Sequence, residues 1–108
     1  MTKKIPFKDF QKLDLRVGTI ITAEKIKESQ NLLRIEADLG KEKRQIISGI
    51  NKQYQPKSLI GQQIVIITNL KSKTIFGLES QGMLLAVDDE TVTLIQPDKK
   101  VKPGAKIC

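Results

Sequence analysis

The stretch from Leu32 to Ile50 reads LLRIEADLGKEKRQIISGI, and it decides the fold. Apolar and polar residues alternate from Leu32 to Leu39, which is the period-two pattern of a half-buried strand. Gly40-Lys41 predicts a tight turn, and the residues from Lys43 to Ile50 predict a returning strand. The two strands therefore form an antiparallel hairpin that carries cations along its second strand.

Further strand signals lie on both sides of this hairpin. The residues from Leu15 to Ala23 alternate in the same way, and those from Gln62 to Leu70 are apolar on both faces, which predicts a central strand. Pro56 to Gly61 has a proline at its start and a glycine at its end, the asymmetry of a short helix. The remaining predicted strands run from Met83 to Val87 and from Thr91 to Gln96.

The order of these elements is typical of the OB-fold, a five-stranded Greek-key barrel. Three strands, one helical turn and two further strands follow one another, with extensions at both termini. We therefore predict an all-β chain whose 108 residues form one domain, 1–108, with a short helix between strands 3 and 4. Such barrels bind oligonucleotides or oligosaccharides on the face of strands 2 and 3 and on the loops after strands 1 and 4.

The net charge of +7 is unevenly distributed along the chain. Residues 41–73 carry seven basic groups and one acidic group, whereas residues 74–96 carry no basic group and four acidic groups. Clustered positive charge attracts polyanions and accelerates their encounter with a protein. This pattern favours nucleic acid as the partner; the alternatives are an acidic membrane surface and simple solubility.

One loop carries two of these cations out of a buried strand. Residues 69–87 read NLKSKTIFGLESQGMLLAV, and Lys71 and Lys73 come directly after the apolar strand. On the OB-fold assignment this is the loop after strand 4, while Lys43 and Arg44 lie on strand 3. The loop after strand 1 is surrounded by Lys25, Lys27 and Asn31. The functional interpretation is a phosphate-contacting surface, and the alternative is an ordinary solvated loop.

The composition excludes several kinds of site. The chain has no histidine, which excludes catalytic triads and histidine-based metal sites, and its single cysteine is Cys108. We therefore expect no metal, no other cofactor and no catalysis by this chain alone. No apolar run is long enough to cross a bilayer, and the N-terminus lacks the apolar region of a signal peptide. We expect a cytoplasmic protein with no membrane partner.

Short motifs occur in a fixed order along nearly the whole chain. They read FQKLDLRVG at 10–18, SGI at 48–50, YQP at 54–56, LIG at 59–61, NLK at 69–71, GLESQGM at 77–83, PD at 97–98 and GAK at 104–106. In this order and spacing they resemble the tRNA-binding domain family, which occurs at the C-terminus of methionyl-tRNA synthetases and as small free-standing tRNA-binding proteins.

The resemblance implies an OB-fold core whose terminal extensions pair two chains into a homodimer. It also implies tRNA binding that depends on RNA structure rather than base sequence, without a catalytic step, and a synthetase catalytic subunit as a further candidate partner. The positions that match the family motif are Arg16, Asn69, Lys71, Ser80 and Met83. With the cations Lys43, Arg44 and Lys73 they form the predicted RNA-binding set. Residues 29–32 read SQNL where the family often has a lysine, and nearby lysines are candidates to replace it.

Several members of this set have a structural alternative. Arg16 lies two residues from Asp14, which favours an ion pair over a phosphate contact. Ser80 is able to bond the backbone at a strand entrance, and Met83 heads an apolar strand, where packing is the usual role. Phe76 is the one ring near the predicted face, so recognition of RNA backbone and shape is favoured over stacking on unpaired bases.

A second function fits the same type of domain. The secretion-associated chaperone CsaA shares it and binds unfolded polypeptide. That role requires an exposed apolar groove rather than a cationic one, and the richness of residues 41–73 in lysine disfavours it.

Overall fold

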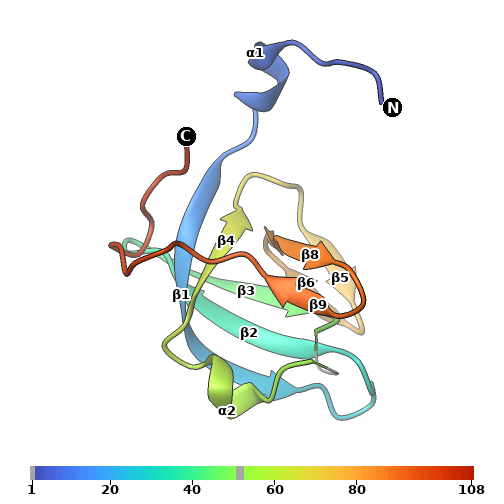
Figure 1. The fold of residues 1–108 in the computed structure, drawn as a ribbon. Coiled ribbons are helices and arrows are strands. Elements are labelled where there is room, and N and C mark those ends of the chain that lie inside the picture. The colour runs from blue at the N-terminus through green and yellow to red at the C-terminus, as the bar shows by residue number, and fades with distance from the viewer. Residues whose placement is uncertain (1, 51–52) are drawn as a thin grey trace.

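The computed structural model describes residues 2–50 and 53–108. Regular secondary structure in these ranges is mostly β-strand, with one short helix at each end of the molecule (Figure 1). The helices are α1 (Phe7–Phe10) and α2 (Pro56–Leu59). The strands are β1 (Leu15–Lys25), β2 (Leu33–Asp38), β3 (Lys43–Ser48), β4 (Gln63–Ile67), β5 (Lys73–Ile75), β6 (Leu78–Ser80), β7 (Met83–Leu84), β8 (Ala86–Asp88) and β9 (Val92–Leu94).

Five strands form one antiparallel sheet in the order β3-β2-β1-β4-β7. The long strand β1 serves both halves of this sheet, because Leu15–Thr19 pairs with β4 and Thr19–Lys25 pairs with β2. A bulge between Ile20 and Thr22 bends β1 near the point where it changes partner. The bent strand curls the sheet into a nearly closed, OB-like barrel, which confirms the predicted fold class.

Gly18 permits the close packing of β1 against the inside of the barrel. A Cβ atom at this position would lie 2.6 Å from Cδ1 of Ile66 and 3.3 Å from Cβ of Ala37. Any other residue would force the side chain of Ile66 to shift, so a glycine here permits the close packing of β1 against the core.

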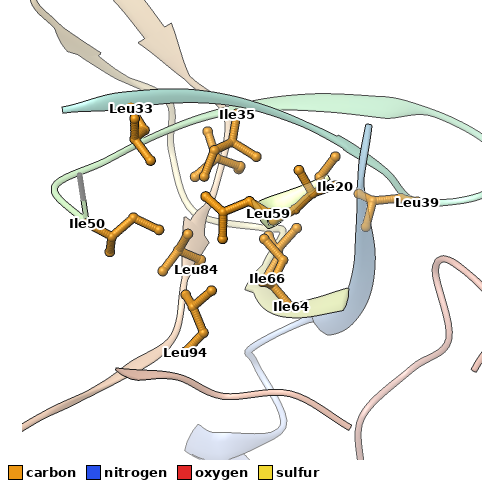
Figure 2. Packing of buried hydrophobic residues seen from close by; sticks show 12 residues of the cluster. Ile20, Leu33, Ile35, Leu39, Ile50, Leu59, Ile64, Ile66, Leu84 and Leu94 are labelled. Atoms are coloured by element: carbon orange, nitrogen blue, oxygen red, sulfur yellow. The ribbon is translucent and has the colours of Figure 1, made fainter. Parts of the chain in front are cut away.

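The hydrophobic core fills the barrel and is aliphatic (Figure 2). Its members come from strands β1 to β4, from β7 and β9, from α2, and from the segments directly after β2 and β3. They are Ile20, Leu33, Ile35, Ala37, Leu39, Ile46, Ile50, Leu59, Ile64, Ile66, Leu84 and Leu94. Leu59 is fully buried, so α2 covers the end of the barrel opposite α1 (Figure 1). Pro56 stands in the first turn of α2, where a missing N–H costs nothing.

Side chains, rather than a continuous strand ladder, close the barrel on the side of β3. The N–H of Ile47 donates to Oγ of Ser80 at 3.0 Å. The N–H of Gln81 donates to the carbonyl of Gln45 at 2.7 Å, and the N–H of Gln45 donates to Oε1 of Gln81 at 3.0 Å. These bonds satisfy backbone groups at the edge of β3 that β2 does not reach, and they attach the segment after β6 to the barrel.

The C-terminal segment runs along the first half of β1. The N–H of Val17 donates to the carbonyl of Ala105 and the N–H of Ile107 donates to that of Leu15, each at 2.9 Å. This segment therefore covers the edge of β1 that β2 leaves open.

The boundaries of the predicted barrel elements agree with the structure to within about three residues, apart from two errors in the second half. The segment expected to be a loop after strand 4 contains the hairpin of β5 and β6. Its turn is Phe76-Gly77, with φ of 54° and 75°, which is the sign that a two-residue type I′ turn requires. The single strand expected from Met83 to Val87 is also wrong, because β7 pairs with β4 whereas β8 pairs with β9. No helix in the described ranges is long and apolar enough to cross a membrane.

Candidate nucleic-acid interface

An apolar hollow of about 640 Å³ lies between the end of β3, the β5–β6 hairpin and β7. We call this hollow the groove. Its apolar walls come from Ile47, Gly49, Leu70, Ile75, Met83 and Leu84. Lys71 and Lys73 line it as well, and both are exposed to solvent. The described residues place no acidic side chain in the lining and none within ion-pair distance of either lysine. The groove therefore combines an apolar floor with positive charge.

Strand geometry places alternate side chains of β5 at the groove. Lys73 and Ile75 both line it, whereas Thr74 between them does not, as expected when successive side chains of a strand point to opposite faces. Met83, on β7, is 54% exposed. The core-packing alternative for Met83 is therefore wrong, since this side chain lies at the groove and not inside the barrel.

Arg16 and Arg44 lie in a second hollow, of about 450 Å³, which we call the cleft. Each guanidinium is paired with a carboxylate two residues earlier, directly before the strand that carries the arginine. Nε of Arg16 lies 3.0 Å from Oδ1 of Asp14, and Nη2 of Arg44 lies 2.7 Å from Oε1 of Glu42. The predicted ion pair of Arg16 and Asp14 is thereby confirmed.

Both arginines also bond to the backbone of distant segments. Nη1 of Arg44 donates to the carbonyls of Thr68 and Gln81, at 2.7 and 2.9 Å. Nη1 of Arg16 donates to the carbonyl of Gly104 at 3.1 Å. Arg44 thus connects β3 to the end of β4 and to the segment after β6, while Arg16 fixes the C-terminal segment. Phosphate contact by either guanidinium stays a prediction.

Asp14 lies at the centre of a polar network before β1. Oγ1 of Thr68 donates to Oδ2 of Asp14 at 2.6 Å, and this bond, together with the guanidinium of Arg16, holds the pKa of Asp14 below its ordinary value. The side chain of Asn69 accepts from the N–H of Asp14 at 2.8 Å and donates to the carbonyl of Lys12 at 2.6 Å. Asn69 therefore ties the end of β4 to the segment that leads into β1.

Ser80 and Lys43 have contrasting surroundings. Ser80 is 6% exposed; its Oγ accepts from the N–H of Ile47 and donates to the carbonyl of Gly82 at 3.2 Å. The backbone bond considered as the alternative for Ser80 is therefore present. Lys43 is exposed on β3 opposite Asp38, and it lines neither the groove nor the cleft.

The register of the sheet relates the loop after β1 to the groove. Lys25 pairs with Leu33, and Leu33 pairs with Ser48, which lines the groove. Because neighbouring strands lie about 4.8 Å apart, the backbone of Lys25 lies about 10 Å from this wall. Lys27 follows in the same loop and is exposed. The two lysines therefore lie within a few nucleotides' reach of the groove.

Six of the eight predicted RNA-binding residues lie in the two hollows, whereas Lys43 and Asn69 line neither. Lys71, Lys73, Ser80 and Met83 line the groove, whereas Arg16 and Arg44 line the cleft. The sequence-based prediction missed the other apolar walls, formed by Ile47, Gly49, Leu70, Ile75 and Leu84. The alternation of Lys73 with Ile75 was a signal from which Ile75 could have been found. Across the described ranges, no group of three or more His, Cys, Asp or Glu side chains is placed to hold a metal ion.

Comparison with known proteins identifies the family. Residues 15–106 match the family model described as "Putative tRNA binding domain". The chain belongs to this tRNA-binding domain family. The methionine–tRNA ligase of Methanothrix thermoacetophila is 53% identical to this tRNA-binding domain over 104 residues, which are 95% of the chain. That of Archaeoglobus fulgidus is 44% identical over 107 residues, or 98% of the chain. The chain spans 15% and 16%, respectively, of the lengths of these two relatives.

Two groups of solved structures share the fold of this tRNA-binding domain. The crystal structure of a MetRS related protein from Pyrococcus horikoshii superposes with a TM-score of 0.93 at 36% identity, covering 99% of this chain and 100% of that one. The chaperone CsaA from Bacillus anthracis gives 0.91 at 37% identity, covering 98% and 100%. The resemblance to both groups that the sequence motifs predicted is confirmed.

Proposed function

We propose that this tRNA-binding domain binds folded tRNA without catalysing a reaction, and that Lys71 and Lys73 make its principal phosphate contacts. The observation that carries the proposal is this lysine pair, which lines the groove with no acidic partner among the described residues, in a chain of the tRNA-binding domain family. A lysine that neutralises a phosphate releases condensed counterions, so the affinity falls as salt rises. Lys43 and the lysines of the loop after β1 extend the contact surface.

Four other predicted residues stabilise the backbone around the site. Arg16, Arg44, Asn69 and Ser80 each use their polar atoms to hold a backbone segment. Because the bonds of Arg44, Asn69 and Ser80 fix the ends of β4 and β6, they also fix the loop and hairpin that carry the lysines, while Arg16 holds the C-terminal segment. In this proposal the four residues position the interface, and any direct RNA contact by them is secondary.

We also propose that two copies associate through the N-terminal segment. Ile5 and Phe7 are 68% and 70% exposed, and Phe10 and Leu13 are 39% and 38% exposed. The rings of Phe7 and Phe10 stack with centroids 6.2 Å apart on α1, which projects from the barrel beside the C-terminal end (Figure 1). Apolar side chains gathered on one exposed segment mark interaction surfaces. A homodimer would present two RNA-binding faces and raise the apparent affinity for one tRNA.

The relatives suggest two settings for this activity. The domain acts either as the C-terminal or β-type module of a methionyl-tRNA synthetase, in which case a catalytic subunit is a further partner, or as a free-standing tRNA-binding protein. In both settings we propose the cytoplasm as its location.

A second candidate function has a specific observation in its favour. The likeness to the chaperone CsaA is accompanied by an exposed groove with mostly apolar walls, the feature that polypeptide binding requires. The lysines at the groove favour an anionic ligand over an unfolded chain of average composition. We therefore rank polypeptide binding second.

Titrations at several salt concentrations separate the two candidates. We expect tRNA to bind more tightly than single-stranded DNA of equal length, with log K falling linearly with log salt concentration. An unfolded polypeptide of no net charge serves as the third ligand. Tight binding of the polypeptide, together with weak binding of tRNA even at low salt, would contradict the tRNA proposal and support the chaperone function.

A further inference from the structure

We infer that the groove accepts an unpaired nucleobase of the bound RNA while Lys71 and Lys73 contact the neighbouring phosphates. The inference rests on the proposed function and adds to it. Recognition of the RNA backbone and shape alone requires only surface cations. An inserted base makes the domain select RNA that has an unpaired nucleotide where it contacts the groove.

The apolar walls of the groove are suited to contact with the flat faces of a base. Leu70, Ile75 and Met83 come from three different segments and line a hollow of about 640 Å³, within the range of pockets that hold small ligands. Met83 and Leu70 are 54% and 43% exposed, so the domain leaves this apolar surface in contact with water. Burying it under a ligand is favourable, and a phosphate group alone cannot do so.

The charges at the groove narrow the class of ligand further. Two lysines line an otherwise mostly apolar hollow, and the described residues place no carboxylate in the lining. A nucleotide joins an apolar ring to an anionic group through its sugar, which matches this combination. An unfolded polypeptide supplies apolar side chains but no regular anionic group, and a paired duplex supplies phosphates but no accessible ring face.

Gly49 gives the groove an open wall and gives the inference a direct test. A Cβ atom added at Gly49 would meet nothing within 4 Å, and Gly49 lies outside the positive-φ region. Because Gly49 lines the groove, a larger side chain there is expected to occupy part of the groove without a clash at its Cβ. Gly49→Leu is therefore expected to reduce the space proposed for the base while both lysines stay in place.

The experiment compares two RNAs with the same number of phosphates, one a blunt duplex and the other a hairpin with an unpaired loop. The wild type is expected to bind the looped RNA more tightly. Gly49→Leu is expected to weaken binding of the looped RNA by roughly ten- to a hundredfold, as expected when the burial of one apolar group is lost, with the salt slope and duplex binding unchanged. Thr93→Leu is the matched control, since Thr93 is exposed on β9 and does not line the groove. Met83→Ala removes one wall of the groove. It is expected to weaken binding of the looped RNA, and because Met83 lies outside the core it should leave the core intact.

The outcomes distinguish this inference from the function on which it rests. If the wild type binds neither these RNAs nor tRNA, the proposed function fails and the inference fails with it; if it binds tRNA but not the looped RNA, only the base site is overturned. If the wild type binds both RNAs equally and neither Gly49→Leu nor Met83→Ala changes either affinity, the base site is overturned while RNA binding stands. If Gly49→Leu abolishes binding of an unfolded polypeptide but spares the looped RNA, the groove holds polypeptide and the base site is likewise overturned.

Discussion

Ser80→Ala decides whether Ser80 closes the barrel or contacts RNA. Its Oγ lies 3.0 Å from the N of Ile47 and 3.2 Å from the carbonyl oxygen of Gly82, and Ser80 and Ile47 are 6% and 7% exposed. Alanine leaves the N–H of Ile47 without its acceptor in a place that water hardly reaches. An unsatisfied buried donor costs about 1–3 kcal/mol, so we expect the free energy of unfolding to fall by that amount.

The assay is urea unfolding at equilibrium, with the free energy extrapolated linearly to water. Ser72→Ala is the control, because Ser72 is exposed between β4 and β5 and its loss should change stability by no more than about 0.5 kcal/mol. Binding of tRNA is then measured where both variants are folded, and Ser80→Ala is expected to bind within about twofold of wild type, a difference well below the roughly 1.4 kcal/mol that corresponds to tenfold. Unchanged stability combined with a large loss of tRNA affinity would refute the closure role and make Ser80 an RNA contact.

Three further predictions concern other parts of the molecule. The pKa of Asp14 is lowered in the folded protein, so its ionised carboxylate stabilises the fold. This contribution is fully present above the ordinary aspartate pKa of about 4 and is lost as the pH falls through the lower pKa of the folded state. Asp14→Asn should therefore be less stable than wild type at pH 7, with the difference shrinking in acid; parallel stability curves from about pH 7 to pH 2 would contradict this. Phe76→Asn should raise the unfolding free energy by roughly 1 kcal/mol and leave tRNA binding unchanged, because Phe76 has φ of 54° and does not line the groove; a loss of affinity would instead make Phe76 a stacking platform. The double variant Phe7→Ser/Phe10→Ser should sediment as a monomer where the wild type is a dimer, and a monomeric wild type at micromolar concentration would contradict the proposed interface.

The barrel was predictable because alternation along its strands distinguishes the buried face from the exposed face. Strand β2, which ends shortly before the turn at Gly40, shows this alternation most clearly. Ile35 and Ala37 are fully buried, whereas Arg34, on the opposite face of the same strand, is exposed. The short helix followed from Pro56 for an equally local reason.

The errors arise where the decisive interaction is not local. The β5–β6 hairpin was missed because its turn places Phe76, a residue poorly suited to positive φ, where asparagine or glycine is usual. The stretch from Met83 to Val87 is apolar throughout, and alternation does not reveal that its two halves pair with different strands.

The candidate site was predictable in part. The ion pair of Arg16 with Asp14 followed from their spacing of two residues, which puts both side chains on one side of an extended chain. Arg44 and Glu42 have the same spacing and pair in the same way, although Arg44 was predicted only as an RNA-binding cation. The groove itself was not predictable, since its walls come from segments whose proximity depends on how the barrel closes.

The salt dependence of tRNA binding tests the central claim most directly. Log K is measured against log salt concentration for the wild type, for Lys71→Ala/Lys73→Ala and for the control Lys99→Ala/Lys100→Ala, whose lysines are exposed away from the groove. At about 1 kcal/mol for each lysine–phosphate contact in water, the first pair should lose roughly thirtyfold in affinity at low salt and about two units of slope, while the control stays near wild type. Equal slopes for the wild type and Lys71→Ala/Lys73→Ala would contradict the placement of the RNA at this groove.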